Sequence, residues 1–92
     1  MSAFVIVEME VINQEAKDRY SKAAAPLIKA FGGEFVAAGQ WTLLAGLPGL
    51  KNGAVIRFDS REKALEWYQS PEYQSLLGDR DEGMTCRFQL IG

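Results

Sequence analysis

The chain has 92 residues, and ten Lys or Arg against twelve Asp or Glu give a net charge of −2. This length predicts a single domain spanning residues 1–92, and a composition with 48% hydrophobic and 24% charged residues excludes a disordered or low-complexity protein. A pI near 5.0 without any basic block excludes the electrostatic pattern of a nucleic-acid-binding protein.

The residue types that the chain lacks exclude several kinds of metal site and catalytic site. The chain has no histidine, which removes the commonest metal ligand, the histidine-based nucleophile pairs and the usual general base near neutral pH. Its one cysteine, Cys86, cannot form an internal disulfide or complete a zinc site. We therefore expect no metal and no cofactor.

The sequence predicts neither a membrane-spanning helix nor a secretion signal. No run approaches the roughly 20 apolar residues of a membrane-spanning helix. The apolar start is interrupted at Glu8 and has no basic segment before it, unlike a signal peptide. We expect a cytoplasmic protein without a membrane or nucleic-acid partner.

The first third of the chain predicts a strand and then a helix. Residues 3–12 are rich in β-branched side chains and alternate between two faces, as in a strand. Asn13 is a suitable N-cap for a helix that ends at Gly32 and Gly33. The predicted buried stripe of this helix consists of Ala16, Tyr20, Ala23, Leu27 and Phe31.

Two further strands are predicted in the middle of the chain. Residues 34–45 form the second strand, with a bulge or bend at Gly39. Residues 46–53 have the composition of a turn, and residues 54–59 form the third strand.

The last third predicts a helix, a short helical segment and a strand. Ser60 caps the helix, and the pair Ser70 and Pro71 starts the short segment, because Ser suits the N-cap and Pro the first helical position. Residues 79–83 are predicted to be a polar loop, and residues 84–91 alternate as a final strand.

The order β-α-β-β-α-β is typical of the ferredoxin-like α+β fold. Right-handed connections place both helices on one face of a four-stranded antiparallel sheet, with the first strand between the third and the fourth. The residues expected to face the helices are Val5, Val7, Met9, Phe35, Ala37, Ile56, Phe58, Cys86, Phe88 and Leu90.

The opposite face of the sheet is expected to be partly apolar, through Phe4, Ile6, Val36, Val55 and Ile91. It also carries Glu8 and Glu10, which we expect to lie between Arg57 and Arg87 on the neighbouring strands. These charges are either half-exposed ion pairs or the lining of an interface between two subunits. Because an exposed apolar patch of this kind marks an interaction surface, we predict a homodimer through the helix-free face.

Aromatic residues are the first candidates for a ligand site. Tyr20, Tyr68 and Tyr73 can direct their hydroxyl groups into a pocket between helices and sheet, although aromatic residues at helical spacing are more often core. Trp41 either lines the mouth of a pocket or covers the sheet edge.

The pair of Glu8 and Arg57 completes the candidate ligand-binding residues. Without histidine, a general base has to be a carboxylate whose pKa is raised by burial, and Glu8 is the candidate catalytic residue for that role.

Two stretches carry a resemblance to a known family. The first is residues 20–26 followed by the glycines 32–33 and Gly39, and the second is residues 60–74 followed by Arg80. Together they resemble the domain-of-unknown-function family DUF1330, in the dimeric α/β-barrel superfamily. The resemblance implies a ferredoxin-like protomer that dimerises sheet to sheet, and it implies no particular activity. Cofactor-independent monooxygenases and small isomerases occur in the wider superfamily.

Two functions remain open on the sequence. The protein either binds or transforms a small aromatic or oxo-acid-like molecule without a cofactor, or it is a non-enzymatic dimerisation and interaction module. No arrangement of residues in the sequence demands catalysis.

Overall fold

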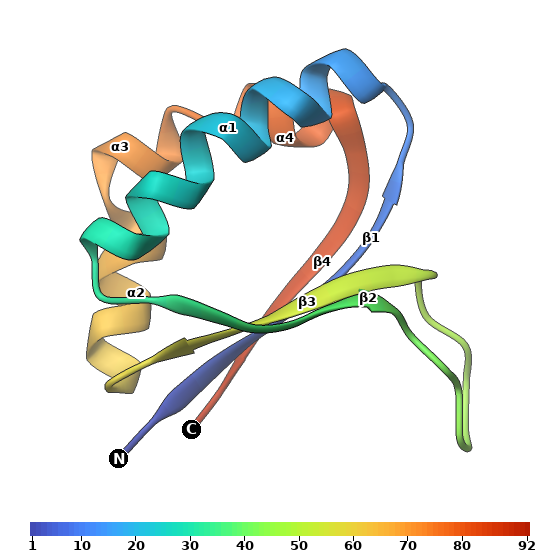
Figure 1. Cartoon of the computed structure of the whole chain (residues 1–92), viewed down its shortest axis with the longest axis horizontal. Coiled ribbons are helices and arrows are strands. Elements are labelled where there is room, and N and C mark those ends of the chain that lie inside the picture. The colour runs from blue at the N-terminus through green and yellow to red at the C-terminus, as the bar shows by residue number, and fades with distance from the viewer.

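The computed structural model describes residues 1–92 and has the predicted ferredoxin-like α+β architecture, with one four-stranded antiparallel sheet in the order β2-β3-β1-β4 (Figure 1). The elements are β1 (Ala3–Val11), α1 (Gln14–Ala30), β2 (Glu34–Gln40), β3 (Asn52–Phe58), α2 (Arg61–Gln69), α3 (Pro71–Gln74), α4 (Leu77–Gly83) and β4 (Met84–Ile91). The first strand lies between the third and the fourth, as predicted.

The three predicted helix starts are confirmed by capping hydrogen bonds. The side chain of Asn13 accepts from the N–H of Ala16, and that of Ser60 accepts from the N–H of Lys63. Ser70 accepts from the N–H of Tyr73 and donates to the carbonyl of Trp67, so one hydroxyl ends α2 and begins α3. These local signals position the aromatic residues of the second half of the chain.

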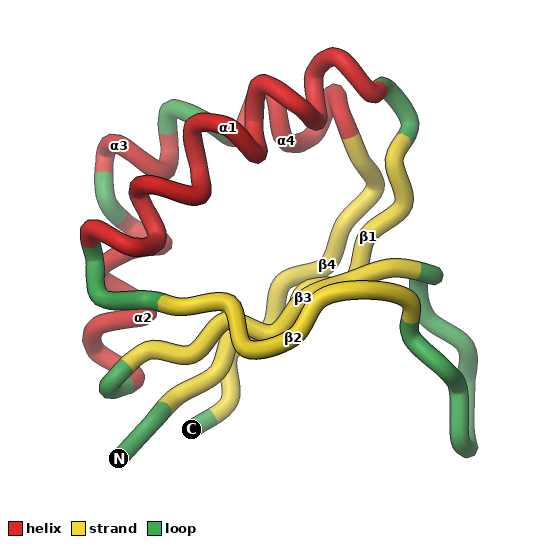
Figure 2. Tube along the Cα trace, in the orientation of Figure 1, coloured by secondary structure: helices red, strands yellow, loops and turns green.

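All four helices lie on one side of the sheet (Figure 2), and the core cluster is built from residues of both layers. Trp67, Tyr73 and Phe58 are the largest fully buried side chains. The other members of the core cluster are Val5, Val7, Tyr20, Ala24, Ile28, Ile56, Ala64 and Met84. No helix is both long and apolar enough to cross a membrane.

The buried stripe of α1 differs from the predicted one in its second half. Ala16 and Tyr20 are buried as predicted, but Ala24 and Ile28 continue the stripe in place of Ala23 and Leu27. The observed residues are four positions apart, so that each lies beside the previous one on the next turn of the helix.

β2 is shorter than predicted, and its bulge is elsewhere. The strand ends at Gln40 instead of residue 45, and the register shifts between Phe35 and Ala37 rather than at Gly39. Because one extra residue reverses the direction of every following side chain, Ala37 pairs with Val55 on the helix-free face and not under the helices.

The polar run 79–83 is helical, and the expected loop is wrong. Residues Leu77–Gly83 form α4, which packs against α1. Gly83 makes the close approach possible, since a Cβ there would lie 2.5 Å from the backbone nitrogen of Lys17. Its carbonyl accepts from the N–H groups of Ile12 and Asn13, which ties α4 to the start of α1.

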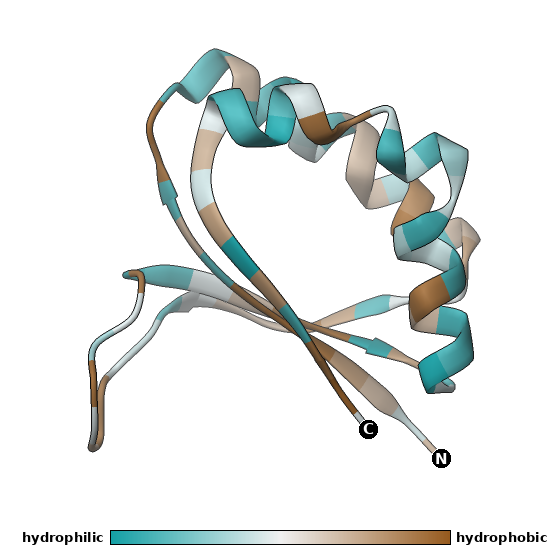
Figure 3. Ribbon diagram, turned by 180° about the vertical axis from the view of Figure 1, so that it is seen from behind, coloured by the Kyte–Doolittle hydropathy of each residue, from teal (hydrophilic) through white to brown (hydrophobic).

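Residues 41–51, which join β2 to β3, project away from the sheet and are called the arm here (Figures 1 and 3). Leu44 and Leu47 are each 93% exposed, and Leu43 is 56% exposed. Figure 3 shows hydrophobic segments along this projection. The arm is therefore a strongly apolar surface that the protomer does not cover by itself.

Candidate functional site

A cavity of about 350 Å³ lies between α1 and the sheet and is called the helix-side cavity. The edge strand β2 is exposed along its whole length, and its residues line the cavity together with residues of α1, β1 and β3. Its lining residues are Val7, Met9, Lys17, Tyr20, Ser21, Ala24, Ala25, Ile28, Phe35, Ala38, Gly39, Asn52, Gly53, Ala54, Ile56, Met84 and Phe88. Lys17 is the one charged residue among them, and no carboxylate lines the cavity.

A hydrogen-bonded cluster of tyrosines adjoins this cavity. The hydroxyl oxygens of Tyr20 and Tyr73 are 2.7 Å apart in a buried hydrogen bond. The Nη1 atom of Arg80 donates to the hydroxyl of Tyr68 at 2.9 Å and to that of Tyr73 at 3.3 Å. The guanidinium also lies over the ring of Phe88, 5.1 Å from its centre. The structure thus brings the three predicted tyrosines together.

Arg80 organises the cluster, and the sequence analysis did not include it among the site residues. Its side chain is only 12% exposed, while its carboxylate partner Asp81 is 63% exposed. The signal that could have found it is helical spacing, because Tyr73, Leu77 and Arg80 recur at intervals of four and three and share one side of a continuing helical turn. Because Arg80 lies among acidic residues in the sequence, the pattern suggested a charge exposed to water.

The buried phenols stay neutral near physiological pH. Burial raises the pKa of Tyr20 well above its ordinary value, and the neighbouring Tyr73 raises it further. Burial also raises the pKa of Tyr73, and this effect outweighs the hydrogen bonds that Tyr73 shares with Tyr20 and Arg80, which lower it. Burial likewise raises the pKa of the Cys86 thiol. The two phenol hydroxyls act as hydrogen-bond donors and acceptors, and none of the three groups is an ionised base.

Glu8 lies on the other face of the sheet, in a second hollow of about 560 Å³ beneath the arm. Its Oε1 atom accepts from the N–H of Leu50 at 3.0 Å, and its Oε2 atom is 3.8 Å from Arg87. A Cβ on Gly49 would overlap the carboxylate, which would then have to turn away from its present position. Glu8 therefore anchors the base of the arm to β1.

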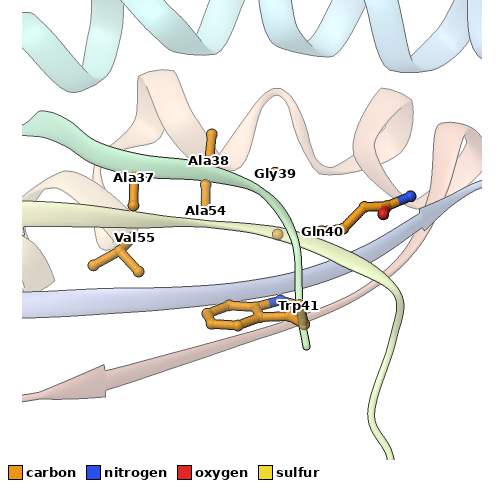
Figure 4. A pocket seen from close by; sticks show the side chains of 8 residues that line it. Ala37, Ala38, Gly39, Gln40, Trp41, Ala54 and Val55 are labelled. Carbon is orange, nitrogen blue, oxygen red and sulfur yellow. The ribbon is translucent and has the colours of Figure 1, made fainter. Parts of the chain in front are cut away.

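Trp41 lies on the same face as Glu8, and its ring lies beneath β2 and β3 on the side away from the helices (Figure 4). The ring contacts the backbone of Gly53, where a Cβ would overlap it. A small hollow of about 140 Å³ is formed by Trp41 and the facing strand residues. Trp41 lines this hollow, and whether it serves a ligand there stays a prediction.

The predicted neighbourhood of Glu8 and Arg57 is wrong. Arg57 pairs with Phe4, four residues away from Glu8 on the same strand, whereas Glu8 pairs with Gly53 and Arg87. The guanidinium of Arg57 instead contacts Glu34 at 3.1 Å and the hydroxyl of Ser2 at 3.0 Å. The strand register, which composition does not reveal, determines these partners.

The candidate residues consequently separate into two groups on opposite faces of the sheet. Tyr20 lines the helix-side cavity and is hydrogen-bonded to Tyr73, which Arg80 links to Tyr68. Glu8 and Trp41 lie beneath the arm. Arg57 belongs to neither group. A ligand in the helix-side cavity would contact a phenol and apolar side chains, and it would not contact the carboxylate of Glu8.

Solved structures share this fold at low sequence identity. RPA0582, a protein of unknown function from Rhodopseudomonas palustris, matches with a TM-score of 0.78 and 16% identity, over 98% of this chain and 80% of that one. SnoaB from Streptomyces nogalater, described as a cofactor-independent oxygenase, matches with a TM-score of 0.68 and 13% identity, over 99% and 91% of the two chains.

A dimeric ferredoxin-like protein of unknown function from Thermobifida fusca matches with a TM-score of 0.66 and 15% identity, over 100% of this chain and 91% of that one. No curated protein matches the sequence. The model of the domain of unknown function DUF1330 matches residues 2–92, which is almost the whole chain. The protein therefore belongs to the DUF1330 family.

Proposed function

We propose that the protein binds a small aromatic or oxo-acid-like molecule in the helix-side cavity. The observation that carries the proposal is the cavity itself, which is about 350 Å³, mostly apolar and bordered by a buried hydrogen-bonding cluster. Ligand pockets commonly combine an apolar lining with a few fixed polar groups. Lys17, the one charged lining residue, favours a neutral or anionic molecule over a cationic one.

The lining residues limit any chemistry that follows binding. No carboxylate, histidine or cysteine lines the cavity, and burial raises the pKa of Tyr20. A reaction there would depend on a proton that the ligand itself loses readily. SnoaB, a protein of the same fold, is described as a cofactor-independent oxygenase. At 13% identity it supports the scaffold alone for this chain.

We also propose that the working form is a homodimer through the helix-free face, and we keep a cytoplasmic location as the expectation from the sequence. Val36 and Ile91 are exposed on this face, and the arm adds three exposed leucines beside it. The face carries both signs of charge, Glu8 and Arg87, so that a twofold-related copy can meet it favourably. A related fold from Thermobifida fusca is described as dimeric.

The test of the cavity is a titration with aromatic acids and oxo-acids, followed by methyl NMR. Ligands are expected to shift the methyl signals of Ile28 and Ile56, which line the cavity. Ala25→Trp should block binding, because Ala25 lines the cavity yet is exposed enough to accept a larger side chain.

Ala23→Trp is the matched control, since Ala23 is exposed on the same helix and does not line the cavity. If Ala25→Trp leaves the affinity unchanged, the ligand binds somewhere other than the helix-side cavity. A panel that shifts no cavity methyl would contradict the proposal and favour the interaction module without a ligand.

A further inference from the structure

We propose that Tyr20 donates a hydrogen bond to a carbonyl or enol oxygen of the molecule held in the helix-side cavity, and that Arg80, acting through Tyr73, strengthens this donor. The inference rests on the proposed function, because it names the chemical group that the same cavity recognises. Tyr20 is the binding residue, and Tyr73 and Arg80 are positioning residues that act through it.

The number of protons in the tyrosine cluster determines which hydroxyl donates to which. A tyrosine hydroxyl has one proton to donate and can accept, whereas a guanidinium only donates. Arg80 donates to the hydroxyl of Tyr73, so the proton of Tyr73 must find another acceptor. The acceptor within reach is the hydroxyl oxygen of Tyr20, at 2.7 Å. Because Tyr73 is fully buried, a proton without an acceptor there would be costly.

The direction of the hydrogen bonds from Arg80 to Tyr20 follows from this count. Arg80 donates to Tyr73, Tyr73 donates to Tyr20, and the proton left over belongs to Tyr20. Tyr20 is also the member of the chain that lines the helix-side cavity. The free donor of the cluster is thus carried by the residue that borders the space where a ligand fits.

The charge of Arg80 strengthens this donor. Its one carboxylate contact, Asp81, is largely exposed and is screened by water, while its Nη1 atom contacts two phenol oxygens in a mostly buried setting. A cation at the head of a buried chain polarises each hydroxyl in turn, because the low local dielectric leaves its field little screened. Burial keeps Tyr20 protonated, so it remains a donor and does not become a base.

The class of ligand follows from the lining. A compact apolar molecule is required by the surrounding aliphatic and aromatic side chains, such as Ile28, Ile56 and Phe88. An oxygen acceptor is required by the free proton of Tyr20. A carbonyl group, or the enol oxygen derived from it, satisfies both conditions, and an amine or a pure hydrocarbon does not.

Two probes of nearly the same shape test the proposal. Acetophenone has a carbonyl group where α-methylstyrene has a CH₂ group, so only acetophenone can accept a hydrogen bond. Wild type is expected to bind acetophenone about fivefold more tightly, which is the effect of one ordinary hydrogen bond. The carbonyl stretching band of bound acetophenone is expected at a lower frequency than in an apolar solvent.

Three substitutions separate the donor from general effects on structure. Tyr20→Phe should abolish both the affinity difference and the band shift. Tyr73→Phe should reduce the band shift, because it breaks the link to Arg80. Tyr68→Phe is the matched control, since it also removes a hydroxyl bonded to Arg80 but leaves the chain to Tyr20 intact. Equal losses in Tyr68→Phe and Tyr73→Phe would overturn the role of the chain.

The outcomes also distinguish this inference from the proposed function. If both probes shift the methyl signals of Ile28 and Ile56 with equal affinity in wild type, the cavity binds ligands and the role of Tyr20 is wrong. If the preference for acetophenone persists in Tyr20→Phe, another donor recognises the oxygen and the inference again fails. If neither probe shifts these signals, the inference and the proposed function fail together.

Discussion

Among single residues, Glu8 has the clearest structural role on the helix-free face. Its carboxylate accepts a hydrogen bond from the N–H of Leu50 at the base of the arm, next to Gly49, which has no side chain to displace it. The ion pair with Arg87 adds little, because the side chain of Arg87 is 62% exposed and the pair is open to water. The hydrogen bond, more than the charge, therefore accounts for the contribution of Glu8.

We expect Glu8→Ala to lower the free energy of unfolding by about 1 kcal/mol, because it leaves the N–H of Leu50 without its acceptor. Glu8→Gln should cost less than about 0.5 kcal/mol, since the amide oxygen still accepts and only an exposed ion pair is lost. Urea unfolding monitored by tryptophan fluorescence measures both values. Equal losses in the two variants would mean that the charge of Glu8, and not its acceptor oxygen, matters.

The buried tyrosines predict a loss of stability in alkali. The pKa of Tyr20 is raised in the folded protein by burial, so above pH 10 the unfolded chain releases a proton that the folded protein retains. The stabilising contribution is complete below pH 10 and falls by about 1.4 kcal/mol for each further pH unit and each such tyrosine. Unfolding free energies measured between pH 8 and about pH 11 should fall less steeply in Tyr20→Phe than in wild type. A slope that this substitution leaves unchanged would contradict the assignment.

At the scale of the elements, the decisive contact is the close approach of α4 to α1. It positions Arg80 beside the tyrosines, and it requires the absence of a side chain at Gly83. The atoms that a Cβ would meet belong to the backbone of Ala16 and Lys17, which cannot move aside as a flexible side chain can. The helical geometry around the site thus depends on one glycine.

Gly83→Ala should destabilise the protein by about 1–3 kcal/mol, the usual cost of overpacking. Gly78→Ala in the same short helix is the matched control, because a Cβ there meets nothing within 4 Å. Alanine is the better helix former, so this variant should gain about 0.5 kcal/mol. Thermal unfolding of the two variants gives the comparison, and a tolerated Gly83→Ala would show that α1 and α4 can separate at low cost.

For the molecule as a whole, the exposed arm and the partly apolar sheet face predict association of two copies. Fully burying Phe4, Ile6, Val36 and Val55 would contribute about 1.5–3 kcal/mol for each side chain. The cost of association is about 4–15 kcal/mol. The sheet face alone is marginal by this comparison, and the arm leucines supply the additional apolar surface.

Sedimentation at micromolar concentration should find wild type as a dimer and Ile6→Asp as a monomer, because Ile6 is central on β1 and faces away from the helices. Leu65→Asp is the control, since it introduces the same charge at an exposed leucine on α2, on the helix side of the sheet. A dimeric Ile6→Asp would place the interface on another surface, and a folded monomeric wild type would refute the dimer.

Much of the fold is predictable from the sequence because its signals are local. The alternation in β1 and the caps at Asn13, Ser60 and Ser70 each act within a few residues. The site is less predictable, because Arg80 reaches the tyrosines only through the packing of α4, and the partners of Arg57 depend on the strand register. Both depend on contacts between distant segments, which composition and spacing do not specify.

The bulge in β2 also makes this edge of the sheet a poor partner for a strand of another molecule. β2 is an edge strand, and the outer side of such a strand can pair with a strand of another molecule, copy after copy, into an amyloid-like fibre. The register shift at Val36 and the positive φ of Gly39 make this edge irregular, so that no long regular ladder can form along it. We therefore expect the exposed β2 edge to template the growth of a fibre less readily than a regular edge strand of the same composition would.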